Sequence, residues 1–340
     1  MAAFRRAIAR CWGLGPLGRL RLRLWLGKRV HAAIAAAHVL GAGGGRSTRA
    51  PLVLLYHRLT ASRRRWEPTR ALEVPADLFR AQMDALRERF RVVPLDRLLD
   101  PAPAGSLPHA AVTFDDGYID TFEIAYPLLK ALGIPAAVFV TTRWLGEEAP
   151  LWWYELEDLA RRGALGQKAA GARWVAYGAE VSRLKTLPES LREARLEELR
   201  RRAAESPSRN WAPRMLSTAQ LLAMDRSGLW TIGGHSHTHP ILTRISLAEA
   251  QAEIGENKRI LEGILGHPVH WFAYPNGGAG DFAAEHADVL RRAGFRGALS
   301  GISPWEEDAA DPFRIPRLSV SGLEGLAEFR NHIRGLFWPR

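Results

Sequence analysis

Short apolar runs alternate with amphipathic segments along most of this chain. The runs have the length and composition of buried strands, and they lie at residues 52–56, 110–114, 136–140, 230–234, 272–274 and 297–300, with a last candidate at 313–320. Apolar residues recur at helical spacing in 79–90, 122–132 and 247–265. Because strands that alternate with helices form parallel sheets covered by helices, the pattern predicts an α/β fold.

Residues from about 144 to 225 depart from this alternation. An aromatic run at 152–154 is followed by a segment at 191–204 that is dense in Arg and Glu and contains no Gly or Pro. Such a composition favours a helix. We therefore predict a helical insertion between two strands of the sheet.

A glycine-rich stretch at 41–45 is typical of a hinge. It separates an N-terminal arm, residues 1–48, from the main domain, which we expect to cover residues 49–325. The remaining residues, 326–340, are expected to form a C-terminal tail.

Composition supports one large domain with a sizeable core, because the chain has 340 residues and 47% hydrophobic content. Cys11 is the one cysteine. A single cysteine excludes an internal disulfide and a cluster of thiolate metal ligands.

Charge is concentrated in the N-terminal part. Residues 1–66 hold 14 Arg or Lys and no Asp or Glu, so a net charge of +11 for the whole chain leaves −3 for residues 67–340. The sequence pI of about 10.4 is therefore a property of the arm. We expect no nucleic-acid partner, because the charge of the main domain does not favour one.

Within the arm, Leu20, Leu22 and Leu24 interleave with basic residues. A basic segment that carries leucine and tryptophan can lie on an anionic membrane surface, so we expect a cytoplasmic protein or one held peripherally on the inner membrane. The longest uncharged run, 30–45, is too short and too rich in Gly and Ala to span a bilayer. The alternatives are a disordered basic tail and an atypical signal segment for export.

The candidate chemistry lies in two short motifs, TFDDGY at 113–118 and HSHTHP at 235–240. Each follows or ends a predicted strand, and catalytic groups of parallel α/β barrels lie at the carboxyl ends of strands. Taken alone, Asp-Asp-Gly is often a turn, and histidines four apart are often a solvated helix face. Together they predict a metal site.

His235, His239 and one carboxylate form the two-nitrogen, one-oxygen ligand set of catalytic zinc sites, which leaves coordination positions for water and substrate. We expect one divalent metal. Zinc is favoured, and cobalt, nickel or iron fits the same ligands. If Asp116 binds the metal, Asp115 stays free to deprotonate water.

These residues resemble the polysaccharide deacetylases of carbohydrate esterase family 4. The resemblance rests on TFDDGY, on GGHSHTHP at 233–240 and on FAYPNGG at 272–278. LLYHR at 54–58 is similar to the opening strand of the bacterial exopolysaccharide branch. The resemblance covers roughly residues 50–320 apart from the insertion. It implies a distorted (β/α) barrel of about seven parallel strands and removal of an N-acyl group, usually acetyl, from an amino sugar.

By the family pattern, Asp115 is the general base, and Asp116, His235 and His239 are the metal ligands. The mechanism that the resemblance implies also uses the backbone N–H of Tyr118 to stabilise the developing oxyanion.

The chain departs from the family pattern at two positions. The last strand candidate, 313–320, has no histidine to serve as the general acid; His332 lies far downstream, and Arg317 cannot give up a proton. The arginine that normally orients the base is replaced by Ala273, so another group must hold Asp115.

Four residues are candidate substrate contacts: His57, Trp153, Tyr274 and Asn276. A lone histidine after a strand is more often structural, and aromatic clusters in insertions are often core.

We therefore expect a metal-dependent hydrolase that removes N-acetyl groups from amino sugars of a polysaccharide or glycolipid, in bacterial exopolysaccharide or envelope synthesis. Two alternatives remain open. One is a hydrolase of a non-sugar amide, and the other is a catalytically silent carbohydrate-binding protein on the same fold.

Overall fold

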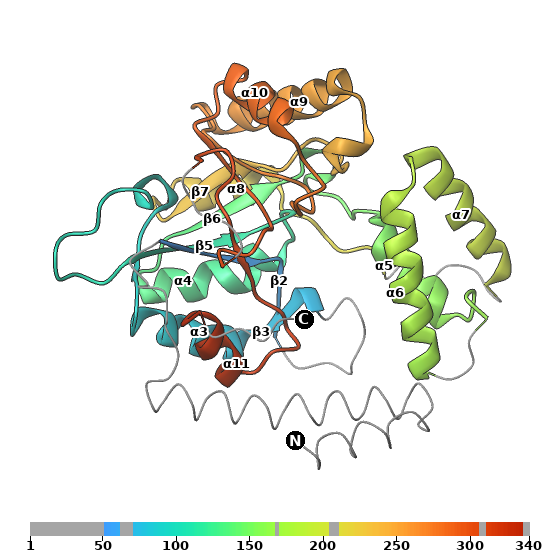
Figure 1. The fold of residues 1–340 in the computed structure, drawn as a ribbon, viewed down its shortest axis with the longest axis horizontal. Helices are drawn as coiled ribbons and strands as arrows, with labels where there is room; N and C mark the ends of the chain where they lie inside the picture. Colours follow the sequence, from blue (N-terminus) through green and yellow to red (C-terminus); the bar gives the residue numbers. More distant parts are fainter. Residues whose placement is uncertain (1–50, 62–70, 167–169, 204–210, 306–310, 336–340) are drawn as a thin grey trace, which may run out of the picture. The chain divides into compact units, whose positions relative to one another are not determined.

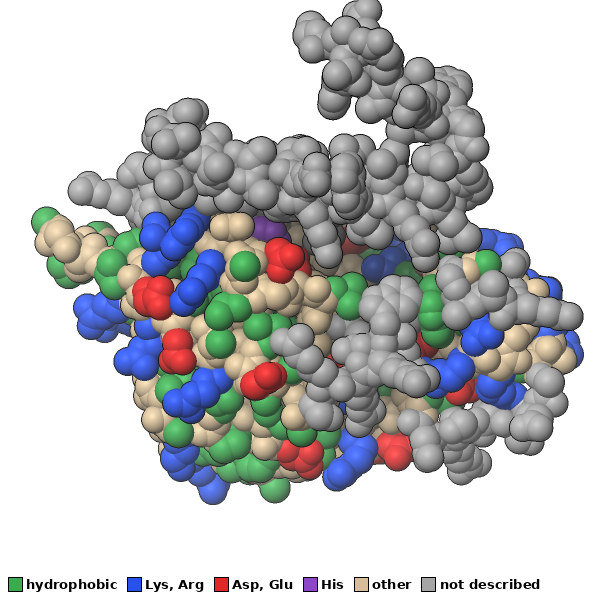
Figure 2. Space-filling view, turned by 90° about the horizontal axis from the view of Figure 1, so that it is seen from below, with side chains coloured by type: hydrophobic (Ala, Val, Ile, Leu, Met, Phe, Trp, Pro, Cys, Tyr) green, Lys and Arg blue, Asp and Glu red, His purple; other side chains and the backbone are tan. Residues whose placement is uncertain are grey.

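A computed structural model describes residues 51–61, 71–166, 170–203, 211–305 and 311–335. The basic arm and its glycine-rich hinge lie outside the described residues, so membrane attachment stays a prediction. No helix among the described residues is long and apolar enough to cross a membrane. On the face shown in Figure 2, the described basic and acidic side chains are interspersed.

The centre of the fold is a parallel sheet of eight strands (Figure 1). The strands are β1 (Leu52–Tyr56), β4 (Arg91–Val92), β5 (His109–Phe114), β6 (Ala136–Val140), β7 (Trp230–Gly234), β8 (Trp271–Ala273), β9 (Gly297–Leu299) and β10 (Leu318–Ser319). Seven of them run in the order β10-β1-β5-β6-β7-β8-β9, and β4 pairs with β5. Strands β1, β5 and β6 are buried along their whole length, as expected for a parallel sheet covered on both faces.

The two ends of this strand order are joined by the segment before β10. Ile315 forms a parallel bridge with Leu299 of β9, and its amide donates to Ala298 O at 3.0 Å. The chain then continues into β10, which pairs with β1. The sheet therefore curls into the distorted (β/α) barrel of about seven parallel strands that the sequence predicts, and that prediction is confirmed.

Helices cover the barrel: α3 (Ala76–Arg87), α4 (Tyr126–Leu132), α8 (Thr218–Asp225), α9 (Leu247–Leu265), α10 (Ala284–Arg292) and α11 (Leu326–His332). A π-helical turn, η3 (Thr121–Ala125), leads into α4. Helix α9 illustrates why these bounds arise. Ser246 and Glu249 form a capping box at its start, and Gly266 ends it in the left-handed region, φ 76°.

Short elements join these helices and strands. β2 (Arg58–Thr60) pairs with β3 (Glu73–Pro75), and 3₁₀ turns include η2 (Leu95–Arg97), η4 (Thr142–Trp144) and η6 (Leu242–Arg244).

The predicted insertion contains α5 (Trp152–Arg161), α6 (Ala170–Thr186) and α7 (Glu189–Arg202), drawn in green in Figure 1. These helices share a core that includes Leu159, Leu184 and Leu196. Arg200 of α7 also binds both carboxylate oxygens of Glu155 in α5, at 2.6 and 2.9 Å. The helices of the insertion therefore pack around a hydrophobic core of their own.

Two helices near the predicted boundaries pack with the barrel. Helix α8 lies within the predicted insertion range but packs against β7 and α9, so it belongs to the barrel. The expected C-terminal tail begins with α11, which packs against α3, and the compact unit runs from Arg49 to Ile333. A short amphipathic helix beyond the last strand gives a weak sequence signal.

Candidate metal centre and active site

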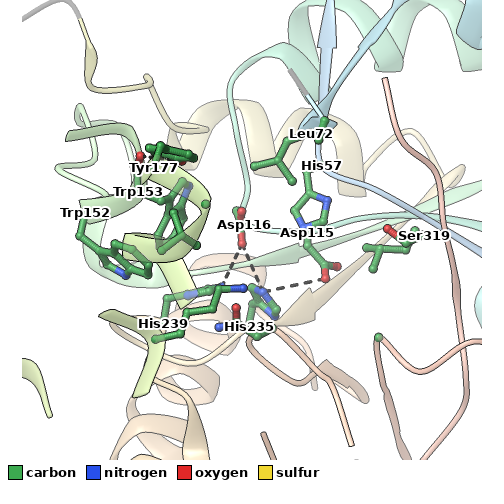
Figure 3. A pocket seen from close by; sticks show the side chains of 17 residues that line it. His57, Leu72, Asp115, Asp116, Trp152, Trp153, Tyr177, His235, His239 and Ser319 are labelled. Carbon is green, nitrogen blue, oxygen red and sulfur yellow. Dashed lines mark hydrogen bonds and ion pairs between the residues drawn. The ribbon is translucent and has the colours of Figure 1, made fainter. Parts of the chain in front are cut away.

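The polar side chains of the two motifs meet at the carboxyl ends of the strands. Asp115 and Asp116 follow β5, His235 follows β7, and His57 follows β1. Because parallel strands end at the same edge of a barrel, residues far apart in sequence converge there. Figure 3 shows Asp116 facing His235 and His239, with His57 beside Asp115.

Three ligand atoms converge on one point. Asp116 Oδ1 lies 3.3 Å from His235 Nε2 and 3.2 Å from His239 Nε2. One ligand atom from each residue lies within 4.8 Å of the others. Asp116 and His235 are buried, and His239 is half-buried at the cavity.

The hydrogen bonding of His235 fits a metal ligand. Its Nδ1 donates to the carbonyl of Ala273 at 2.7 Å, which leaves the lone pair on Nε2, the nitrogen that faces Asp116. A second hydrogen bond of this kind is typical of metal-binding histidines. Asp116 Oδ1 is buried and has no hydrogen-bond partner by distance and angle among the described residues. An unpartnered buried oxygen between two imidazole nitrogens is the donor set that a divalent cation satisfies.

The backbone at this site is unusual. Four non-glycine residues among the described ones have positive φ: Asp116 at 73°, Ser236 at 61°, His239 at 64° and Asn276 at 59°. All four lie in the motif loops that border the cavity. Left-handed backbone at a non-glycine residue costs free energy and is concentrated at functional sites. The turn at Asp116 places the two adjacent aspartates in different environments.

Charge interactions shift the pKa values of the ligands. Burial raises the pKa of Asp116, but the adjacent imidazoles of His235 and His239 bring it well below the ordinary value. Burial lowers the pKa of His235, but the neighbouring carboxylates of Asp115 and Asp116 raise it overall. A metal ion would have to displace a proton from such an imidazole, so we expect metal binding here to weaken as the pH falls.

Asp115 is held by an arginine that the sequence analysis did not assign. Arg317 Nη1 donates to Asp115 Oδ1 and Nη2 donates to Oδ2, each at 2.7 Å. The Arg317 side chain is 1% exposed, and its Nε donates to the carbonyl of Ser300. Burial raises the pKa of Asp115, but the charge and hydrogen bonds of Arg317 bring it below the ordinary value. Arg317 therefore supplies the interaction that is missing at Ala273.

Asn257 of α9 supports the loop that carries the histidines. Its Nδ2 lies 2.9 Å from Val140 O and 2.6 Å from Ser236 O, so it joins the ends of β6 and β7. A Cβ atom at Gly234 would lie 2.4 Å from Asn257 Oδ1. Glycine at that position is what lets the amide approach the strand.

A cavity of about 390 Å³ opens beside the ligands. His57, Trp153 and Asn276, three of the four predicted substrate contacts, line it. Figure 3 shows Trp152, Trp153 and Tyr177 gathered on the side of the cavity opposite His57. Burial lowers the pKa of His57, and the charges of Asp116 and Asp115 oppose that effect.

The fourth predicted contact, Tyr274, is corrected by the structure. Its side chain is fully buried, stacks on Phe282 with ring centroids 4.0 Å apart and donates its hydroxyl to the carbonyl of Phe313 at 2.9 Å. A side chain with these partners is part of the core and does not reach a substrate.

The backbone amide of Tyr118, which we predicted to stabilise an oxyanion, points away from the segment that pairs with it, at Met215. Tyr118 forms an antiparallel bridge with Met215 in which Ile119 N donates to Arg214 O and Gly117 O accepts from Leu216 N. The N–H of the central residue in such a bridge points outward. Its role in an oxyanion hole stays a prediction.

The geometry predicts metal loss on removing either histidine. The His235→Ala and His239→Ala proteins should each lose stoichiometric zinc, because two remaining ligands hold it weakly. Elemental analysis after dialysis measures this, with circular dichroism to confirm folding. His237→Ala is the matched control, because the ring of His237 lies against Thr142, 3.0 Å from its Oγ1. Full zinc content in both ligand variants would place the metal elsewhere.

Comparisons with known proteins agree with this site. The family model for polysaccharide deacetylase matches residues 104–183 and 193–298. YxkH of Bacillus subtilis is 28% identical over 117 residues, which is 33% of this chain and 39% of YxkH, so the match spans about two fifths of that relative.

Solved structures share the fold. IcaB from Ammonifex degensii has a TM-score of 0.55 at 19% identity, covering 84% of this chain and 96% of IcaB. The Streptococcus pyogenes deacetylase PplD, solved with acetate, has a TM-score of 0.53 at 17% identity, covering 83% of this chain and 97% of PplD. With the family model matching more than half of its length, this chain belongs to the polysaccharide deacetylase family.

Proposed function

We propose that this protein is a metal-dependent hydrolase that removes N-acetyl groups from amino sugars of a polysaccharide or glycolipid. The observation that carries the proposal is the division of labour between the two aspartates. Asp116 faces two histidines as a metal ligand, whereas Asp115 is held beside them by Arg317 and remains available as a base. The same proposal places this activity in bacterial exopolysaccharide or envelope synthesis.

Asp116, His235 and His239 would hold the metal, and zinc suits this ligand set best. When bound, the metal polarises the acyl carbonyl and lowers the pKa of water. Asp115 accepts the proton of the attacking water, because Arg317 keeps its carboxylate ionised and fixes its orientation. In this proposal, the backbone N–H of Tyr118 would donate to the developing oxyanion.

The amine that leaves must receive a proton, and we assign this step to His57. The guanidinium of an arginine does not give up a proton in proteins, so Arg317 cannot be the general acid. His57 lines the cavity beside Asp115; burial lowers its pKa overall, and the carboxylates of Asp116 and Asp115 oppose that effect in part. In this proposal, a histidine that follows the first strand takes the place of the one that the last strand lacks.

The function is tested by acetate release from N-acetylglucosamine oligomers with the zinc-loaded protein. Asp115→Asn should lower kcat by about 10²- to 10⁴-fold, the usual contribution of a general base, while zinc content stays stoichiometric. Activity that survives this substitution would remove Asp115 from the mechanism. No release from any sugar, but release from a peptide-like N-acetyl amide, would identify a non-sugar substrate.

His57→Gln should slow amide hydrolysis by about 10²- to 10⁴-fold and leave hydrolysis of 4-nitrophenyl acetate much less affected. The phenolate leaves without a proton, so it does not need a general acid. Asp115→Asn is the comparison, because loss of the base should slow both substrates. Equal losses on both substrates in His57→Gln would argue that His57 has a structural role.

Arg317→Lys should lower kcat/KM by roughly tenfold, because lysine cannot form the two parallel charge-assisted hydrogen bonds. Arg317 lowers the pKa of Asp115, and the base works only when ionised. Weakening the interaction therefore raises that pKa and moves the acid limb of the kcat/KM profile to higher pH.

The pH profile of Arg317→Lys is measured beside Arg314→Lys, a change at an exposed residue of the same segment. The control should keep the wild-type profile. An acid limb that stays in place in Arg317→Lys would show that Arg317 does not set the protonation of the base.

A further inference from the structure

One face of α6 forms a wall of the cavity. Four residues of this helix line it: Tyr177, Gly178, Val181 and Lys185. Their spacing places them along one side of the helix. At a rise of 1.5 Å per residue, the distance from Tyr177 to Lys185 along the helix axis is about 12 Å.

The Tyr177 end of this wall is tied to the metal centre. The Tyr177 hydroxyl donates to the carbonyl of Trp153 at 3.2 Å. The Trp153 ring in turn lies against His239, with ring centroids 5.3 Å apart. Two turns of helix then separate this aromatic end from Lys185.

Lys185 is the one lysine or arginine among the described residues that line the cavity. Its side chain is exposed, and no described carboxylate forms an ion pair with it. The two carboxylates that line the cavity are Asp115 and Asp116, both committed at the metal end, where Arg317 and the histidines contact them. Within the described part of the chain, the other end of the α6 wall therefore presents a positive charge with no carboxylate paired to it.

We propose that Lys185 binds an anionic group of the substrate, a carboxylate or a phosphate, about two helical turns from the acetamido group that is hydrolysed. The substrate class is thus an acidic glycan or a phosphate-linked glycolipid. The proposal rests on the proposed deacetylase function and adds its selectivity. Aromatic side chains pack against the sugar rings in between, and the ammonium group forms a charge-assisted hydrogen bond with the anion.

The test compares three substrates by acetate release: a neutral N-acetylglucosamine oligomer, an oligomer alternating N-acetylglucosamine with glucuronate, and N-acetylglucosamine linked through diphosphate to a short prenyl chain. The readout is the ratio of kcat/KM for each acidic substrate to that for the neutral one. In Lys185→Glu this ratio should fall at least tenfold, the contribution typical of a hydrogen bond to a charged group. Lys185→Arg should largely restore it.

Lys130→Glu is the matched control, because Lys130 is an exposed lysine of α4 that does not line the cavity. It should leave the ratio at the wild-type value. A fall confined to the glucuronate oligomer identifies a carboxylate as the ligand, and a fall confined to the diphosphate identifies a phosphate. A ratio that is unchanged for both acidic substrates in Lys185→Glu overturns the proposal.

A binding experiment distinguishes failure of the proposed deacetylase function from failure of the Lys185 proposal. If no substrate releases acetate, titration calorimetry of the zinc-loaded wild type and Lys185→Glu with the same three compounds decides the inference. Tighter binding of an acidic compound that is lost in Lys185→Glu supports the Lys185 site without deacetylation. Equal dissociation constants for acidic and neutral compounds in the wild type rule it out.

Gly178 tests the wall independently of charge. A Cβ atom there meets no described atom within 4 Å, and its φ is not in the left-handed region, so a larger side chain fits the fold and extends into the cavity. Gly178→Leu should raise KM for the oligomers several-fold, whereas Gly178→Ala should change it little. An unchanged KM in Gly178→Leu would show that substrate does not lie along α6.

Discussion

The buried pair of Asp115 and Arg317 is the interaction on which the rest of the site depends. Two adjacent aspartates are buried at the end of β5, and neither can stay ionised there without a compensating partner. Asp115 receives a bidentate arginine, and Asp116 receives two imidazoles and, by our proposal, a metal. Because a buried ion pair contributes little net stability, its presence here is better explained by the chemistry it permits. By the proposed function, this pair provides a base that is ionised, oriented and separate from the metal ligands.

The separation of the two carboxylates is achieved by backbone that the surrounding fold must stabilise. The left-handed turn at Asp116 and the similar conformations at Ser236 and His239 each cost about 1–3 kcal/mol. The fully buried strands β5 and β6 and the amide of Asn257, which links Val140 O and Ser236 O, hold these loops in place. The barrel therefore acts as a rigid support for the strained loops. The proposed metal ligands lie on these loops, directly after the strands that hold them in place.

Sequence reasoning reached the parts of the structure that depend on local pattern. The apolar runs became strands, and the helix expected at 247–265 has those bounds because its capping box and terminal glycine are local signals. Arg317 was missed because its partner lies 202 residues away, and nothing in its neighbours indicates a buried arginine. Tyr274 was misassigned because a motif position does not reveal which way a side chain points. Its burial is decided by Phe282 and the Phe313 carbonyl, which only the folded chain brings near.

By our proposals, chemistry and selectivity lie on parts of the chain with different cores. The proposed ligands and base follow barrel strands, whose interior includes Val53, Phe139 and Ala273. The α6 wall belongs to the insertion, whose helices pack around Leu159, Leu184 and Leu196. Substitutions on the exposed face of α6 can therefore alter which glycan fits without moving the metal ligands, since neither core is changed. A barrel that keeps its strand ends fixed while the insertion varies can apply one hydrolytic mechanism to different acylated sugars, and this is how we interpret the insertion's place in the cavity.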